Sequence, residues 1–206
     1  MIASNAYRKA QFAKSIQQKK FCGFDLAGTD WVNLGIDLCG FSFKGTNLSG
    51  ANFQGLLLDG VNFLGANLSG ADFSFATLNK VCFAQCQLED AQFTNAVLSQ
   101  AAFHRVMLRW GQFHHAGLEA ALFQDSDLSH ARFSHANLHR AFFKKVSLKG
   151  ANLRWADLCK ARFQYTNCWG AYLPDGHQAG NSVDLNAFTH CHGAGKTVDL
   201  EFETLP

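Results

Sequence analysis

Proline is nearly absent from this chain: among 206 residues it occurs only at positions 174 and 206. Because proline lacks the backbone N–H that a hydrogen-bonded ladder needs, the first 173 residues are compatible with an unbroken ladder. Long apolar runs are missing as well, since no segment approaches the ~20 residues of a membrane span. The N-terminal segment MIASNAYRKAQFAKSIQQKK also lacks the apolar stretch of a secretory signal, so we expect a cytoplasmic protein.

An excess of charge is also absent. Lys and Arg total 18 against 16 Asp and Glu, a net charge of +2, so bulk charge gives no reason to expect direct nucleic-acid binding. Charged residues make up 17% and hydrophobic residues 48%, which excludes a disordered polar chain. The seven cysteines are odd in number and irregularly spaced, which favours reduced thiols over a disulfide framework.

Phenylalanine is abundant, and its positions are periodic. From Leu38 to Leu173 every fifth residue is large and apolar, except Cys168, and leucine alternates with phenylalanine. Leucine fills 13 of the 14 odd slots and phenylalanine 12 of the 14 even ones. The residue two positions earlier is alanine in 16 of 28 cases and is never charged. A period of five is neither the 3.6 of a helix nor the 2 of a strand, so it predicts a chain that turns every five residues and stacks its coils as a solenoid.

The segments ANLSGADFSFATL (66–78), HANLHRAFF (135–143) and KGANLRWADLCKARF (149–163) resemble the pentapeptide-repeat proteins, whose motif is A-(D/N)-L-x-x. The resemblance covers roughly residues 24–173. It implies an all-β solenoid, a right-handed quadrilateral β-helix of about eight coils with four pentapeptides per coil. Residues 20 apart would then stack, so leucines would form two opposite inner columns and phenylalanines the other two.

Glycine occupies the second position after the large residue seven times in succession, from Gly40 to Gly70. A type II turn needs a positive φ there, which glycine adopts without steric cost. From Phe75 onward this position is mostly not glycine. We therefore expect a change of turn type at Phe75.

Three segments are expected along the chain: an N-terminal helical cap (1–20), the β-helix (21–175) and a C-terminal cap or tail (176–206). A helix over the helix formers of residues 4–17 would cover the open edge of the first coil. Before residue 36 the five-residue series runs two residues early, so we expect a small bulge at 34–35 that restores the frame. In the tail, 183–185 and 198–200 repeat fragments of the motif, which suits either a partial coil or an edge strand.

Candidate chemistry is sparse. A regular prism offers no cleft for a catalytic triad, so we expect neither catalytic residues nor a cofactor. His190 and His192 have the spacing that points two metal ligands the same way in a strand, and His177 is a conceivable third ligand. A histidine-rich tail explains these three residues equally well, so we expect no metal site. The Asp and Asn residues that precede large apolar residues are expected to form hydrogen bonds within the ladder.

Charge is uneven along the repeat. Residues 36–100 carry two basic and five acidic groups, a net −3, whereas residues 101–165 carry ten basic and four acidic groups, a net +6, and six of the nine histidines. Stacking by 20 brings basic, aromatic and imidazole side chains of the second stretch onto one surface: His114, His115, Arg132, His135, Arg154 and Trp155, with Trp110 stacked on His130 at a second corner. This mixture suits an anionic partner or a hydrogen-bonding protein surface; a merely solvated basic face is the alternative.

These features favour a non-enzymatic protein-binding or scaffold module with an unknown protein partner. The family resemblance implies an alternative, because some pentapeptide-repeat proteins resemble B-form DNA and bind type II topoisomerases such as DNA gyrase, which protects against quinolone-like poisons. Eight coils would span roughly 38 Å, and DNA of that length carries ~20 negative charges. Residues 36–175 carry ten acidic and twelve basic residues, so the charge pattern disfavours DNA mimicry.

Overall fold

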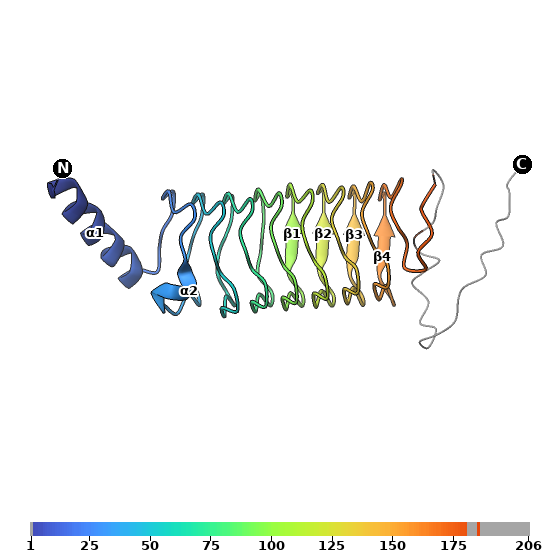
Figure 1. Ribbon diagram of the computed structural model, residues 1–206, viewed down its shortest axis with the longest axis horizontal. Helices are drawn as coiled ribbons and strands as arrows, with labels where there is room; N and C mark the ends of the chain where they lie inside the picture. The colour runs from blue at the N-terminus through green and yellow to red at the C-terminus, as the bar shows by residue number, and fades with distance from the viewer. Residues whose placement is uncertain (1, 181–184, 186–206) are drawn as a thin grey trace, which may run out of the picture.

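The computed structural model describes residues 2–180 and 185, and its body is a row of coils that advance along one axis (Figure 1). The elements in chain order are helices α1 (Ile2–Gln17) and α2 (Trp31–Leu34), then strands β1 (Ala102–His104), β2 (Leu122–Gln124), β3 (Phe142–Lys144) and β4 (Arg162–Gln164). The four strands form one parallel sheet in the order β1-β2-β3-β4. Within the described residues, neither helix has the length and hydropathy needed to cross a bilayer.

Each coil takes 20 residues. Phe103 of β1 pairs with Phe123 of β2, which pairs with Phe143 of β3, and single bridges repeat the same 20-residue register on the other sides of the coil. Since the chain turns every five residues, four pentapeptides complete one coil. The first coil is longer, because Lys20 pairs with Ser42, 22 residues away. The extra two residues coincide with the helical turn α2.

The core is formed by the periodic apolar residues. Every large residue of the series from Leu38 to Leu173 is at most 9% exposed, and the phenylalanines form the two predicted columns. Within one column Phe93 stacks on Phe113 with ring centroids 4.8 Å apart and an interplanar angle of 5°. The two columns meet edge to face across the axis, as Phe103 and Phe113 do at 84°. The interior is therefore a close-packed aromatic and leucine core.

The corners keep one backbone conformation along the repeat. The second residue after each large one has a positive φ at Gly70 (66°), at Phe75 (61°) and at every later corner up to Tyr165 (54°). The expected change of turn type at Phe75 is wrong, because non-glycine residues also adopt the left-handed conformation here, at a cost of about 1–2 kcal/mol each. Hydrogen bonds between coils and the packed core hold them in it.

One corner in each later coil differs in its hydrogen bonding. At most corners the residue after the turn donates back to the large residue, as Ala76 N–H does to Phe73 O at 3.0 Å. After β1, Val106 N–H donates instead to Ser126 Oγ of the next coil, at 3.1 Å. A small polar residue at the inner position therefore satisfies a buried backbone group that the turn leaves open.

The polar residue before each large one caps its own turn. Asp37 Oδ1 accepts from Cys39 N–H at 2.9 Å, and Asp72 Oδ1 accepts from Ser74 N–H at 2.8 Å. Bonds between coils are added in places, as where Asn67 Nδ2 donates to Asn47 Oδ1 at 3.3 Å. The predicted hydrogen-bonding role is confirmed, and most of these side chains act within one turn rather than between coils.

Both ends of the stack make contacts with flanking segments. In α1, the Phe12 ring lies 5.0 Å from Phe21 and 6.4 Å from Trp31, so the C-terminal half of the helix packs on the first coil. At the other end Gln178 pairs antiparallel with Tyr172, so the chain folds back along the last coil. The candidate motif fragment at 198–200 and the candidate ligands His190 and His192 lie outside the described residues.

Candidate interaction surface

The eight residues singled out on the outer surface belong to one side of the solenoid. Segments 111–115, 131–135 and 151–155 stack on one another, and residues 110 and 130 form the edge column just before them. We call this surface, with its two edges, the basic face. It comprises His114, His115, Arg132, His135, Arg154 and Trp155, with Trp110 and His130 on the near edge.

The far edge of the basic face is a ladder of stacked rings. His115 and His135 stack at 4.8 Å between centroids, and His135 and Trp155 stack at 4.9 Å, with interplanar angles of 8° and 14°. All three residues occupy corners with positive φ, which turns their side chains outward. Trp155 remains 64% exposed, so a large ring is presented to solvent in a fixed orientation.

The flat part of the basic face is rich in cationic groups. Arg154 lies with its guanidinium carbon 3.9 Å from the centroid of the Tyr172 ring, a cation–π contact that orients the side chain. Arg132 is exposed in the next column, and Ser134 between the two is buried although it points outward. Partial burial, together with the positive charges of Arg132 and the neighbouring imidazoles, lowers the pKa of His114 below its ordinary value of 6.5. His114 is therefore neutral at pH 7, and the arginines supply the fixed charge.

The near edge carries a second stack. Trp110 and His130 lie 4.3 Å apart between ring centroids, as the 20-residue spacing predicts. Beside it, Lys149 Nζ lies 5.0 Å from the centroid of the Trp169 ring. The sequence analysis missed this pair and the Arg154–Tyr172 pair, although both consist of a cation and an aromatic residue spaced 20 or 18 apart. A search for such pairs would have found them.

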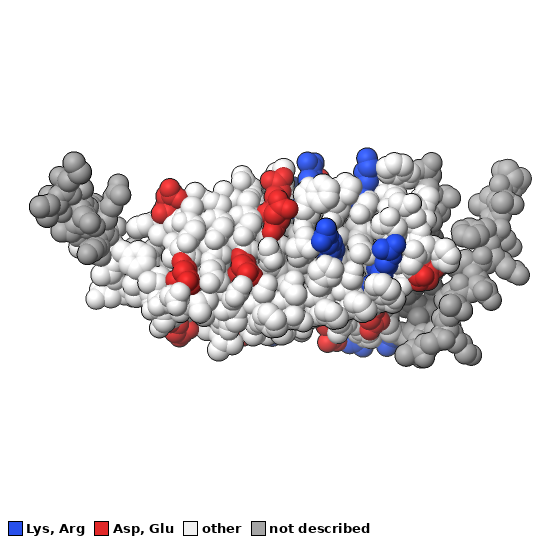
Figure 2. Space-filling view, viewed as in Figure 1, with Lys and Arg blue, Asp and Glu red and all other residues white. Residues whose placement is uncertain are grey.

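Charge is segregated along the rod. On the side shown in Figure 2, basic side chains gather over the C-terminal half, whereas acidic side chains cover the N-terminal half. Some charges are paired, as where Arg109 Nε lies 2.6 Å from Asp127 Oδ2. Arg132 and Arg154 of the basic face have no acidic group in their own segments, 131–135 and 151–155.

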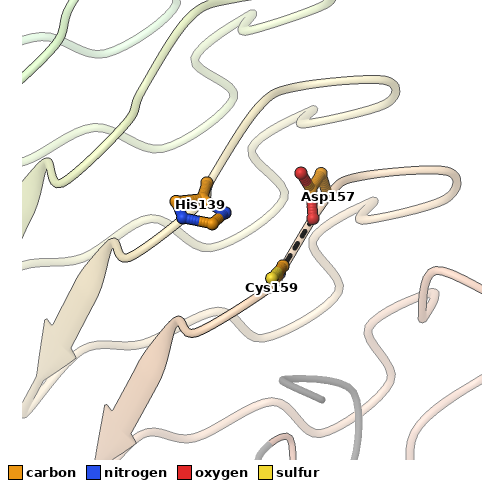
Figure 3. A group of neighbouring side chains, drawn as sticks. All are labelled: His139, Asp157 and Cys159. Carbon is orange, nitrogen blue, oxygen red and sulfur yellow. Dashed lines mark hydrogen bonds between the residues drawn. The ribbon is translucent and has the colours of Figure 1, made fainter. Parts of the chain in front are cut away.

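The metal candidates do not converge. His177 Nδ1 lies 3.0 Å from Asp175 Oδ2, which gives that imidazole a local partner. Elsewhere His139, Asp157 and Cys159 bring their ligand atoms within 4.8 Å of one another (Figure 3). Cys159 is disulfide-bonded, so its sulfur is not a thiolate ligand. Asp157 Oδ1 already accepts a hydrogen bond from Cys159 N–H at 2.9 Å.

The cysteines divide into two groups. Cys22, Cys39, Cys82 and Cys86 carry free thiols, as expected. The expectation of reduced thiols is wrong for Cys159, because spacing alone cannot reveal a pairing that depends on the chain beyond the repeat. Cys82 points outward and Cys86 inward, and burial raises the pKa of Cys86 to about 12. Cys86 is therefore a packing residue rather than a nucleophile.

The geometry defines a parallel β-solenoid built from five-residue repeats. Two family models match it: a pentapeptide repeat region over residues 36–113, and pentapeptide repeats (8 copies) over residues 112–150, 126–164 and 151–175. The chain belongs to the pentapeptide-repeat family.

Solved structures share the fold. Full-length QnrB1, a plasmid-mediated fluoroquinolone resistance protein, matches with a TM-score of 0.50 and 20% identity over 82% of this chain and 95% of that chain. A trypsin-treated QnrB1 variant matches with a TM-score of 0.52 and 18% identity over 82% and 90%. A pentapeptide repeat protein from the Arabidopsis thaliana thylakoid lumen shares 30% identity over 62% and 70%, with a TM-score of 0.36. No curated protein matches this chain. At these identities the likeness to QnrB1 establishes the fold alone.

Proposed function

We propose that this chain is a non-enzymatic scaffold that binds an acidic protein partner through the basic face. The observation that carries the proposal is the exposed ladder of His115, His135 and Trp155. Tryptophan and arginine are the residues that most often dominate binding energy at protein interfaces, and both occur here side by side. Their display on a rigid surface without an adjacent acidic group favours a negatively charged partner.

Preorganisation supports the same conclusion. Binding normally costs about 0.5–1.5 kcal/mol for each flexible side chain that becomes immobilised. In the basic face, stacking already orders the ladder rings, and the Tyr172 ring already orients Arg154. Much of that cost is therefore met when the protein folds, so more of the contact energy contributes to affinity.

The ends of the rod fit this role. We take the body to be a right-handed, four-sided β-helix of about eight coils, with α1 as a cap on its first coil. The contacts of Phe12 with Phe21 and Trp31 support the cap. An open end of a β-solenoid exposes unpaired backbone groups that invite end-to-end stacking. A covered end leaves the lateral faces as the surface for partners.

The test compares affinity capture by three proteins with quantitative mass spectrometry. The basic-face variant replaces His115, Arg132, His135 and Trp155 with alanine. The matched control carries the same kind of change on the opposite side of the coil, at His104, Arg105, Lys145 and Tyr165. We expect the basic-face variant alone to lose a partner that the wild type and the control both retain, while all three give the same far-UV circular dichroism. Identical partners for all three proteins would contradict the assignment of this face.

A second function is carried by the shape of the rod. The fold match extends over 95% of the QnrB1 chain, a protein of fluoroquinolone resistance. On this alternative the rod would bind DNA gyrase, although its near-neutral body lacks the charge density of DNA. A supercoiling assay with purified gyrase, with and without a quinolone, distinguishes the two functions. Protection of gyrase would favour the alternative, and no effect at tens of micromolar would reject it.

A further inference from the structure

A recess opens on the near edge of the basic face, where a column of corner side chains stops. The column consists of Trp110, His130, Gly150 and Gly170, at intervals of 20 residues. The first two rings stack at 4.3 Å, and the next two positions have no side chain. The recess has a volume of about 440 Å³ and is lined by His130, Lys149, Gly150, Trp169, Gly170 and residues 178–179.

The glycine at position 150 serves space rather than backbone conformation. Its φ of 63° is shared by the non-glycine residues at every other corner from Phe75 to Tyr165, so the turn itself does not demand glycine here. A Cβ at position 150 would lie 2.7 Å from Cε1 and Nδ1 of His130. Glycine therefore leaves room against the side of the His130 ring that faces away from Trp110.

The second glycine extends the same space. A Cβ at Gly170 would find its nearest neighbour, Gln178 Nε2, at 3.9 Å, so nothing in the described residues crowds that position. Gln178 Nε2 donates to Gly170 O at 3.1 Å, and Gly170 N–H donates to Ala179 O at 2.8 Å. These bonds fix the end of the recess opposite His130.

One wall of the recess is cationic and aromatic. Lys149 Nζ lies 5.0 Å from the centroid of the Trp169 ring, and Trp169 is 50% exposed. The Lys149 ammonium thus lies beside the recess without being enclosed by it. A slot with an imidazole at one end, an indole at the side and an ammonium at its mouth suits a flat ring that carries a negative charge.

We propose that this recess binds a small planar aromatic anion, whose ring stacks on His130 and whose carboxylate pairs with Lys149. Stacked rings on this protein repeat at 4.3–4.9 Å along the corner columns, close to the spacing of the coils. A bound ring over Gly150 continues the Trp110–His130 stack by one step. This site is separate from the ladder of the proposed function, so each stands or falls by its own test.

The experiment measures binding of three probes to the full chain by following the indole N–H signals of the protein in ¹⁵N-correlated NMR spectra. The probes are 2-naphthoate, which is planar and anionic, 2-naphthylmethanol, which is planar and neutral, and cyclohexanecarboxylate, which is anionic and not planar. We expect 2-naphthoate to shift the signals of Trp110 and Trp169 and to leave Trp155 unchanged. It should bind about fivefold more tightly than 2-naphthylmethanol, and cyclohexanecarboxylate should not bind.

Three variants complete the test. Lys149→Met should lower the affinity for 2-naphthoate about fivefold and leave that for 2-naphthylmethanol unchanged. Gly170→Trp should fill the recess and abolish binding of both, since other corners of this chain already carry tryptophan. The matched control is Gly60→Trp, at a glycine corner of another column with nothing within 4 Å of an added Cβ. It should bind as the wild type does. Binding that survives Gly170→Trp, or no binding of 2-naphthoate at about 5 mM, would overturn the proposal.

Discussion

Replacing Phe113 with alanine tests the aromatic columns that define the core. Its ring is fully buried between two parallel rings, Phe93 at 4.8 Å and Phe133 at 4.7 Å. Burial of phenylalanine alone predicts a loss of about 3–5 kcal/mol in the free energy of unfolding. The upper half of that range is expected, because each stacked pair contributes about 0.5–1.5 kcal/mol beyond the buried area and the stacked coils cannot collapse into the cavity.

The assay is denaturant unfolding followed by far-UV circular dichroism, with Phe75→Ala as the matched control. Phe75 is 64% exposed and occupies an outer corner, so the same truncation there should cost less than about 0.5 kcal/mol. For a chain of this length, a loss of about 4 kcal/mol corresponds to a fall of roughly 8–16 °C in Tm. Equal effects of the two substitutions would refute the inward placement of the phenylalanine columns.

Four further outcomes follow from individual contacts, three of them measured as changes in unfolding free energy. Lys80→Gly should raise it by up to about 1 kcal/mol, because lysine holds a φ of 59°; an unchanged midpoint would show that the corner is unstrained. Ser126→Ala should lower it by about 1–3 kcal/mol, because Val106 N–H loses its acceptor, and a neutral result would contradict that bond. Cys86, with its pKa raised to about 12, should resist alkylation at pH 8 until the protein unfolds, as mass spectrometry can establish. The lowered pKa of His114 means that the unfolded chain binds more protons near pH 6.5, so stability should decrease as the pH falls through that value. In His114→Gln this slope should be shallower, and an identical slope would exclude His114 as its source.

The sequence was sufficient to predict the core because each of its positions repeats. The alternation of leucine and phenylalanine at intervals of five fixes which residues point inward, and the same arithmetic placed His115, His135 and Trp155 in one column. Their ring distances of 4.8 and 4.9 Å confirm that placement. Register in a solenoid follows from counting, since every coil uses the same number of residues.

Features that depend on departures from the repeat were not predictable in this way. Phe75 accepts a left-handed backbone because its neighbours hold it there, and intrinsic preference alone indicates a different turn. The disulfide of Cys159 depends on chain geometry that the repeat does not encode. The recess at Gly150 and Gly170 depends on what a glycine omits, and a pattern of glycines reads first as a pattern of turns.

The opposite net charges of the two halves give the rod a permanent electric dipole along its long axis. Residues 36–100 carry −3 and residues 101–165 carry +6, with centres about 16 Å apart at ~4.8 Å per coil. In the field of an acidic macromolecule this dipole experiences a torque that turns the C-terminal half forward before any contact forms. The alignment acts within a Debye length of about 8–10 Å, so association should slow as ionic strength rises while the geometry of the bound state stays the same.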